Sequence, residues 1–381
     1  TSRASCPDLK AWDREFLSCV ACVLPIGKKE AAVDRVIDFV VQLATQHGGE
    51  ADVEDAFVEM LVRWLLARCS NKEKAVRYRA TQLVGGVFNG MHEDIEVSDE
   101  LFDDVEACML ERCQDKMPAV RAEAVTGLFR LQNPDDARDR CTKELLRLMS
   151  EDPAKEVRMA AISAIAPGKT AIRFIMLRAR DAVEGVRMHA LKVLREKVEM
   201  RWLSIEQRVH LLEGSLRDRA EDVAKAAENM LRGSWLRSNC KDDVLHLLRA
   251  LGAERHEKVA QMALDVLLED GASRELVRQA AFKAWNRDSY EPGDDFQPEA
   301  ALCLRSYLEW LAGAPGSKNE GKGDRNAAAE AAPELPDMCD ALRTASRACE
   351  AEKFSSLLAG TCTVAQLAKA AALCDFANHA G

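Results

Sequence analysis

The sequence contains few aromatic residues and only modest amounts of glycine and proline. Phe, Trp and Tyr make up 5% of the 381 residues, and there are 20 Gly and 11 Pro. Strand-like alternation of apolar and polar residues is also scarce, which disfavours a protein built on β-sheets. The composition therefore predicts an almost entirely helical protein.

Long apolar runs are missing as well. No stretch reaches the roughly 18 to 20 apolar residues needed to span a bilayer, and residues 1–49 lack the layout of a signal peptide. The 13 cysteines are scattered along the chain, which favours a reducing compartment over secretion. The first residue is Thr1 and not Met, so we expect a processed chain or a fragment.

Signatures of catalysis and metal binding are equally scarce. Cys19 and Cys22 form a lone CxxC in an apolar stretch without a second Cys or His pair nearby, so we expect buried thiols rather than a zinc site. The seven histidines are isolated, and His189 and His210 lie on predicted helices without a neighbouring nucleophile. There is no glycine-rich phosphate-binding loop. We therefore predict neither an enzyme nor a cofactor or metal site.

What the chain does contain is a repeat. An acid or amide is followed five places later by an apolar residue, four later by alanine, and four later again by a bulky apolar residue. Copies begin at Asn71, Asp115, Asp152, Asp181, Asp218 and Glu254, which are 44, 37, 29, 37 and 36 residues apart. Steps of four keep the apolar positions on one helix face, and the small alanine lets a neighbouring helix approach closely.

Spacings of this size suit a unit of two helices, with the repeat as its inner helix. Such units must bury their apolar faces on their neighbours, so the pattern predicts an all-α solenoid of stacked antiparallel helix pairs. It resembles HEAT repeats. We expect the leading aspartates to cap the helices that follow, with Pro118 and Pro153 in the first turns of those helices.

Composition divides the chain into four parts. Residues 1–50 are predicted to form an N-terminal helical pair, and residues 51–312 the repeat solenoid. Residues 313–336, GAPGSKNEGKGDRNAAAEAAPELP, are of low complexity and are predicted to be a disordered linker. Residues 337–381 regain helical character but do not fit the repeat.

Basic residues recur near the starts of the repeated helices, although the net charge is −10. In a solenoid the charge of one face matters more for ligand binding than the net charge of the whole chain, since a basic groove attracts a polyanion even in an acidic protein. The candidate DNA-binding residues are Lys72, Lys74, Arg77, Arg79, Lys116, Arg121, Lys155, Arg158, Arg178, Arg180, Arg187 and Lys192.

These bases also have a structural interpretation. Arg121, Arg158 and Arg187 each follow the aspartate of their repeat by six residues. At that spacing in HEAT-like repeats, Asp and Arg commonly form a ladder of hydrogen bonds between repeats. Lys72, Lys74 and Arg79 lack this spacing, so a phosphate contact and a solvated face are both open for them. Contacts to phosphate would position a DNA backbone without reading its bases.

Several segments carry a pattern more specific than the repeat. They include EKVEMRWLSIEQRVHLLEGSLRDRAEDV from Glu196, DDVEACMLERCQDKMPAVRAEAVTGLFRLQNPDD from Asp103 and EVRMAAISAIAP from Glu156. Generic HEAT repeats share the skeleton of Asp, Val, Arg and Ala, but not MRWLSIEQRV or LFRLQNPDD. Over roughly residues 28–308 the chain resembles the condensin complex subunit 3 family, the HEAT-repeat subunit CAP-G, in its N-terminal part.

The resemblance implies a non-catalytic subunit that docks on the kleisin subunit of condensin (CAP-H type). Together they would hold double-stranded DNA in a positively charged groove, without sequence specificity, for mitotic chromosome condensation. The family's basic patch corresponds best to Lys72, Lys74, Arg77 and Arg79. ATP hydrolysis would belong to the SMC subunits, which are indirect partners.

The resemblance also implies a location in the nucleus and on chromosomes, admits a cytoplasmic pool, and implies no membrane partner. Family members are usually much longer than this chain. The alternative is a protein-only HEAT scaffold or adaptor that binds peptides rather than DNA.

Overall fold

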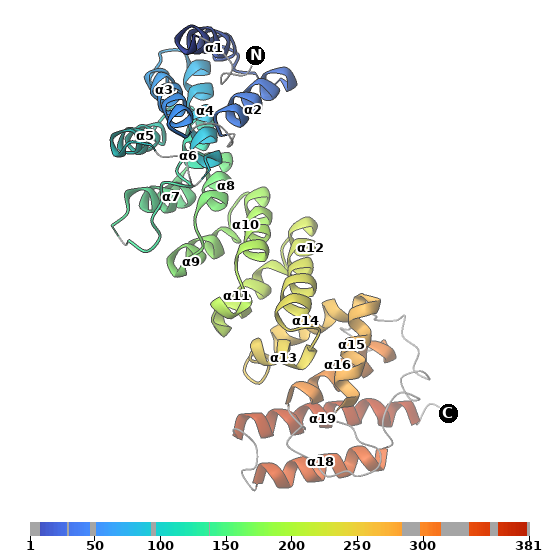
Figure 1. Ribbon diagram of the computed structural model, residues 1–381. Coiled ribbons are helices and arrows are strands. Elements are labelled where there is room, and N and C mark those ends of the chain that lie inside the picture. Colours follow the sequence, from blue (N-terminus) through green and yellow to red (C-terminus); the bar gives the residue numbers. More distant parts are fainter. Residues whose placement is uncertain are drawn as a thin grey trace. The chain divides into compact units, whose positions relative to one another are not determined.

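The computed structural model describes residues 8–28, 30–45, 51–92, 97–136, 138–283, 298–313, 335–350 and 357–378. Every regular element in these ranges is a helix, as predicted (Figure 1). None of the described helices is long and apolar enough to cross a bilayer. The chain divides into two compact units, residues 1–193 and 194–381, with the boundary inside helix α10.

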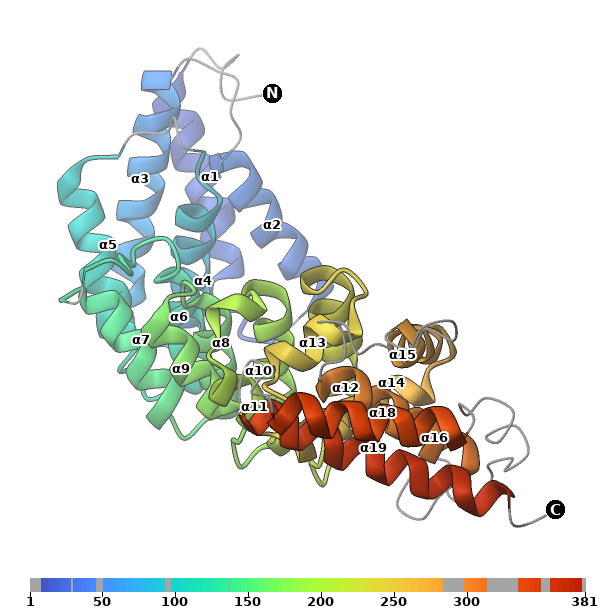
Figure 2. The same ribbon diagram turned by 90° about the horizontal axis from the view of Figure 1, so that it is seen from below.

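The first unit consists of two layers of helices. The outer layer contains α1 (Leu9–Val23), α3 (Ala51–Cys69), α5 (Asp99–Arg112), α7 (Arg140–Glu151) and α9 (Lys169–Arg178). The inner layer contains α2 (Ala31–Thr45), α4 (Lys74–Gly90), α6 (Pro118–Gly127), α8 (Lys155–Ala164) and the start of α10 (Glu184–Lys197). Each layer packs in sequence order: α4 contacts α2 and α6, and α5 contacts α3 and α7 (Figure 2).

The repeated apolar positions form the core of the inner helices, as predicted. All eighteen are buried. They are Val76, Ala80, Val84, Val120, Ala124, Leu128, Val157, Ala161, Ile165, Val186, Ala190, Leu194, Val223, Ala227, Leu231, Val259, Ala263 and Leu267. A spacing of four residues therefore identified the face of each helix that packs against its neighbours.

The aspartate at the start of a repeat closes a turn ahead of its helix. Asp115 Oδ1 accepts the backbone N–H of Met117 at 2.9 Å, and Met117 is the N-cap of α6. Pro118 is the first residue of α6, as predicted, but Pro153 lies outside α8, whose N-cap is Ala154. The capping prediction was thus wrong by two residues, because an Asp side chain reaches the N–H two positions on in an Asx turn.

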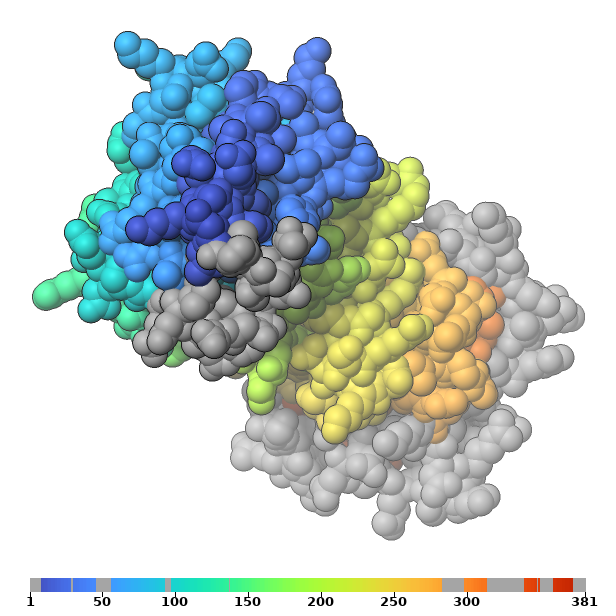
Figure 3. All heavy atoms as spheres, turned by 45° about the horizontal axis from the view of Figure 1, so that its top comes forward, coloured from blue at the N-terminus to red at the C-terminus, as the bar shows by residue number. Residues whose placement is uncertain are grey.

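The second unit continues with short helices and ends in longer ones. They are η2 (Met200–Trp202), α11 (Ile205–Ser215), α12 (Glu221–Asn229), η3 (Met230–Asn239), α13 (Val244–Ala250), α14 (Glu257–Glu269), α15 (Gly271–Lys283), α16 (Pro298–Ala312), α18 (Leu335–Glu350) and α19 (Leu357–Asn378). Figure 3 shows the yellow α13 and α14 forming one surface with the orange α15 and α16. The predicted linker lies outside the described residues, except for Gly313 and the first two residues of α18.

A buried arginine places the C-terminal helix that the repeat pattern left unplaced. Arg305 of α16 donates to Glu257 of α14 at 2.9 Å, and to Gln261 and Gln366 at 2.6 Å each. Lys369 of α19 donates to the same glutamate at 3.0 Å. Burial opposes ionisation of Glu257, but hydrogen bonds from Gln366, Lys369 and Arg305 lower its pKa to about 2. The network ties α14, α16 and α19 together.

Two glycines permit the close packing of α4 on α6. A Cβ at Gly85 would lie 3.1 Å from the Cα of Gly127, and a Cβ at Gly127 would lie 3.4 Å from the Cα of Gly85. Backbone atoms cannot move away as a flexible side chain can. The helices therefore approach more closely here than an alanine would allow.

We predict that Gly85→Ala lowers the free energy of unfolding by about 1 kcal/mol, because overpacking outweighs the gain in helix propensity. Equilibrium unfolding in urea, followed by circular dichroism, measures the change. Gly185→Ala in α10 is the control, since its Cβ would meet no atom within 4 Å. If Gly85→Ala is as stable as the unchanged chain, or more stable, the Cβ added between α4 and α6 has no energetic cost and the prediction is wrong.

Candidate nucleic-acid interface

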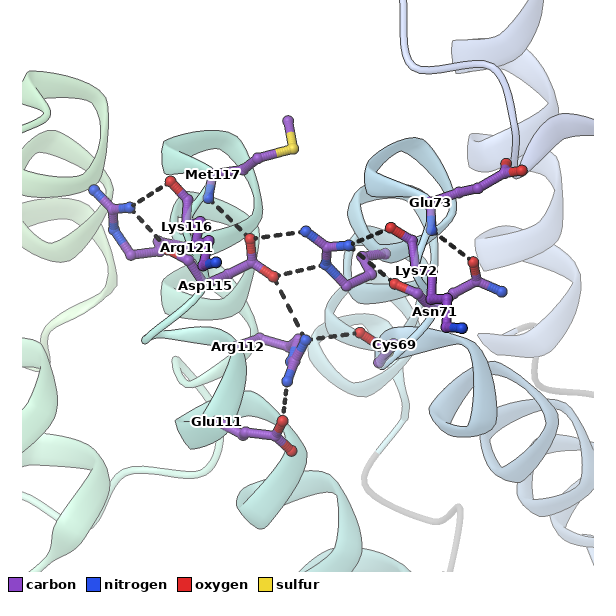
Figure 4. A network of polar contacts seen from close by, with 11 residues as sticks. Cys69, Asn71, Lys72, Glu73, Glu111, Arg112, Asp115, Lys116, Met117 and Arg121 are labelled. Carbon is purple, nitrogen blue, oxygen red and sulfur yellow. Dashed lines mark hydrogen bonds and ion pairs between the residues drawn. The ribbon is translucent and has the colours of Figure 1, made fainter.

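Arginine–aspartate pairs join the starts of successive inner helices. The pairs are Arg77–Asp115, Arg121–Asp152 and Arg158–Asp181, with shortest N–O distances of 2.8, 2.7 and 2.8 Å. Each arginine also donates to a backbone carbonyl at the start of its own repeat, as Arg121 does to Asp115 at 2.9 Å (Figure 4). The ladder predicted for Arg121 and Arg158 is confirmed, and Arg77 extends it by one repeat.

Three further candidate arginines also bind within the protein. Arg79 is 1% exposed and donates to two carbonyl oxygens in the loop before α2, at 2.8 and 3.0 Å. Arg178 contacts the carboxylate of Asp181 at 3.3 Å. Arg187 is 4% exposed and donates to the carbonyl oxygen of Asp181 at 3.0 Å. Six of the twelve candidate residues therefore bond to other groups of the protein. They are Arg77, Arg79, Arg121, Arg158, Arg178 and Arg187.

Two of the ladder carboxylates, Asp115 and Asp181, are held in their ionised form. Burial alone would raise the pKa of Asp115 and Asp181, but hydrogen bonds from Arg77 and Arg158 and from backbone N–H groups lower both pKa values. The hydrogen bond that Arg77 donates to the Asp115 carboxylate raises the pKa of Arg77 in turn. In the Arg77–Asp115 and Arg158–Asp181 pairs both side chains are therefore charged, and their opposite charges cancel. A paired arginine consequently offers little electrostatic attraction to an external phosphate.

The lysines among the candidates are placed differently. Lys72, Lys74, Lys116 and Lys155 are exposed and lie within two residues of the first residue of α4, α6 or α8. Their ammonium groups have no ion-pair partner among the described residues. Since the ladder joins the starts of these helices, the four lysines follow one edge of the inner layer. We call this set the lysine edge.

The remaining two candidates are also exposed but lie elsewhere. Lys192 is on α10, and Arg180 lies in the turn that precedes α10. Sequence reasoning found all of these bases and assigned Arg121 and Arg158 to the ladder by their spacing, but it left the roles of Lys72 and Lys74 open.

Two predictions about reactive side chains were wrong. Cys19 and Cys22 are exposed rather than buried, because α1 buries the side that carries Val20. His189 does have a hydroxyl neighbour, since its Nε2 lies 2.7 Å from Ser163 Oγ on the adjacent inner helix. No local pattern indicates this contact, which joins residues 26 positions apart.

Metal ligands do not gather in the part of the chain that the structure describes. No group of three or more His, Cys, Asp or Glu side chains there could hold a metal ion.

Comparison with known proteins gives a consistent result. The chain is 34% identical to condensin complex subunit 3 of Xenopus laevis over 322 residues, which cover 83% of this chain and 30% of the relative. The Homo sapiens relative of the same name is 34% identical over 313 residues, which cover 80% of this chain and 30% of the relative. The Schizosaccharomyces pombe relative of the same name is 32% identical over 257 residues, which cover 67% of this chain and 29% of the relative. No family model matches the chain.

A solved structure agrees with these relatives. The chain is similar to a chain in the crystal structure of the S. pombe condensin Cnd3–Cnd2 subcomplex, with a TM-score of 0.79 and 26% identity. The similarity covers 94% of this chain and 44% of the solved one. The chain therefore spans about a third of the length of the relatives it matches in sequence.

Breaking one step of the ladder tests its structural role. We expect Arg158→Met to lower the free energy of unfolding by about 3 kcal/mol at pH 7, because it leaves Asp181 charged and buried without its main partner. Arg158→Met combined with Asp181→Asn should recover part of this loss, since the uncompensated charge is gone. A decrease below about 1 kcal/mol in the single variant, measured by urea unfolding, would contradict the structural role.

The stabilising effect of the Arg158–Asp181 pair should also depend on pH. The pKa of Asp181 is lowered in the folded protein, so the pair contributes stability above the ordinary Asp pKa of about 3.9, and this stability is lost as pH falls through the folded pKa. The difference in stability between the unchanged chain and Arg158→Met should therefore shrink below about pH 4. A series of unfolding curves from pH 7 to 3 measures it, and a constant difference would argue against an ionised pair.

Proposed function

Because the chain belongs to the condensin complex subunit 3 family, we propose that it is a non-catalytic HEAT-repeat scaffold that docks on the kleisin subunit of condensin. We further propose that it binds double-stranded DNA without reading its sequence and so serves mitotic chromosome condensation. The lysine edge is the observation that supports the DNA contact. Its charges are exposed, whereas the neighbouring arginines are neutralised by aspartates.

The mechanism follows from the chemistry of the ammonium group. A lysine offers a mobile point charge that contacts phosphate oxygens in many orientations and so needs no particular base sequence. Each phosphate that is neutralised releases condensed counterions, which makes the affinity fall steeply with salt. The starts of α4, α6 and α8 add the partial positive charge of helix N-termini along the same edge.

Acidic neighbours limit the strength of this contact. Glu73 lies between Lys72 and Lys74, and Glu156 follows Lys155. The two carboxylates reduce the net positive charge of the edge. We therefore expect this chain alone to bind duplex DNA modestly, and more tightly when the kleisin subunit adds to the interface.

The partners follow from the family. The solved S. pombe relative is a subcomplex of two condensin subunits, Cnd3 and Cnd2, which supports a kleisin partner for this chain. The SMC ATPase subunits would supply the hydrolysis of ATP and act on this subunit indirectly. A nuclear and chromosomal location accords with this role.

We predict that replacing the four lysines of the lysine edge by alanine weakens duplex binding at least 10-fold at 50 mM salt. The slope of log affinity against log salt should become shallower by about 0.9 for each phosphate that is no longer neutralised, and all duplex sequences should be affected alike. Fluorescence anisotropy of a labelled duplex measures both quantities. Arg77 and Arg79 are left unchanged, because their replacement would disturb the fold.

Lys143→Ala with Lys169→Ala is the matched control, because both lysines are exposed on outer helices. The control should bind as the unchanged chain does. If the lysine-edge variant also binds as the unchanged chain does, the assignment of the DNA contact is wrong. Peptide binding that is insensitive to salt, without any duplex affinity, would favour the protein-only scaffold.

A further inference from the structure

Two cysteine thiols meet where the outer helices of two successive repeats pack together. Cys69 is the last residue of α3 and is buried, whereas Cys108 lies one turn before the end of α5 and is partly exposed. Helix α3 packs on α5, and the two thiols form a hydrogen bond with each other. The thiols are thus adjacent, although they belong to different repeats.

Arg112 holds the two helices together at this point. Its Nη1 donates to the carbonyl oxygen of Cys69 at 3.1 Å and also contacts the Asp115 carboxylate at 3.5 Å (Figure 4). Cys108 precedes Arg112 by about one helical turn, so both side chains extend from the same face of α5. The bond from Arg112 to α3 therefore keeps the Cys108 thiol beside the end of that helix.

Buried donor groups without other partners lie around the two thiols. Thr81 of α4 is fully buried beside the Cys69 thiol, and its hydroxyl bonds to no oxygen or nitrogen atom in the described part of the chain. The Nε of Arg112 is also buried and has no hydrogen-bond partner among the described residues. A buried donor that lacks an acceptor costs free energy. A thiolate at this place would accept a hydrogen bond from the hydroxyl and attract the guanidinium.

These surroundings make the first proton of the two thiols easier to remove. The hydrogen bond with Cys108 is the main cause of a lowered pKa at Cys69. The Thr81 hydroxyl and the Arg112 charge lower this pKa further, and burial opposes them. The hydrogen bond with Cys69 and burial raise the pKa of Cys108. After the first ionisation the two sulfur atoms therefore share one proton, and the partly exposed Cys108 sulfur gives a small oxidant access to the thiolate.

Two neighbouring thiols of the outer layer lack these features. Cys113 follows α5, Cys141 lies in α7, and both are completely buried. Burial raises the pKa of both thiols, that of Cys141 to about 12. A thiol that is buried and protonated is inert toward oxidants. Exposure and ionisation therefore distinguish Cys69 and Cys108 from the cysteines beside them.

We infer that Cys69 and Cys108 form a reversible redox pair, which hydrogen peroxide closes to a disulfide between α3 and α5. The proton of Cys108 passes to Cys69, and the Cys108 thiolate attacks the peroxide. An S–O bond forms, the O–O bond breaks, and hydroxide leaves. The Cys69 sulfur then attacks the sulfenic acid at Cys108, so that the S–S bond forms and the S–O bond breaks. The second hydroxide leaves as water with the Cys69 proton. The two cysteines lose two electrons, and these reduce the peroxide.

The disulfide would complement the ladder. The ladder joins the starts of successive inner helices, whereas the disulfide would join two successive outer helices. In reducing compartments disulfides are usually transient and sense the redox state. The reaction needs neither DNA nor a partner subunit, so its test is separate from that of the proposed function.

The test treats the full, reduced chain with hydrogen peroxide, blocks the remaining thiols by alkylation and maps the peptides by mass spectrometry. A peptide pair linked through Cys69 and Cys108 should form at least about 10-fold faster than Cys113 or Cys141 is oxidised. Dithiothreitol should separate the linked peptides. In the variant Cys69→Ser the resolving thiol is gone, so Cys108 should persist as a sulfenic acid that dimedone traps.

The exposed Cys19 and Cys22 show whether the oxidant is active. Cys19→Ser combined with Cys22→Ser is the control variant, in which the link should form at the unchanged rate. The inference is wrong if Cys69 and Cys108 stay reduced while Cys19 or Cys22 is oxidised. It is also wrong if Cys108 is oxidised in the unchanged chain without a bond to Cys69. Should Cys69→Ser fail to fold by circular dichroism, the linked peptides of the unchanged chain decide alone.

Discussion

The buried pair of an arginine with the aspartate of the next repeat is the interaction on which the first unit depends. A bidentate pair such as Arg121–Asp152 holds the start of one inner helix against the start of the next. A charge removed from water is tolerated only when its partner is equally fixed, so each pair fixes the register between repeats. The same pairs neutralise Arg77, Arg121 and Arg158, and the exposed positive charge of the edge is left to lysine.

The fold could be predicted from the sequence because the burial of the helices is periodic. Val120, Ala124 and Leu128 have counterparts in every repeat, and all such positions are buried. Spacing also predicted the ladder role of Arg121 and Arg158, but it did not separate Arg77 from the lysines beside it. Arg77 and Lys74 are three residues apart, but only Arg77 has a carboxylate partner among the described residues. That partner, Asp115, lies 38 positions further along the chain. Contacts over that distance depend on how the repeats stack.

Two other features depend on packing that local sequence does not encode. The stretch MLRGSWLRSN has no local pattern that predicts a wide helix, yet it forms the π-helix η3, with Trp235 buried and Asn239 bound to η2. Arg305 bonds to Gln366 across 61 positions and so places α19 beside α16. The wide helix and the placement of the C-terminal helices could therefore not be predicted from periodicity, whereas the repeat helices could.

In this account arginines hold the repeats together, whereas lysines face a ligand. Acetylation of lysines with and without a saturating DNA duplex, read by mass spectrometry on the full chain, tests this division most directly. The account predicts that duplex DNA protects Lys72, Lys74, Lys116 and Lys155, while Lys143 and Lys169 on the outer helices react as before. Equal reactivity of the four lysines with and without duplex, under conditions where DNA is bound, would contradict it.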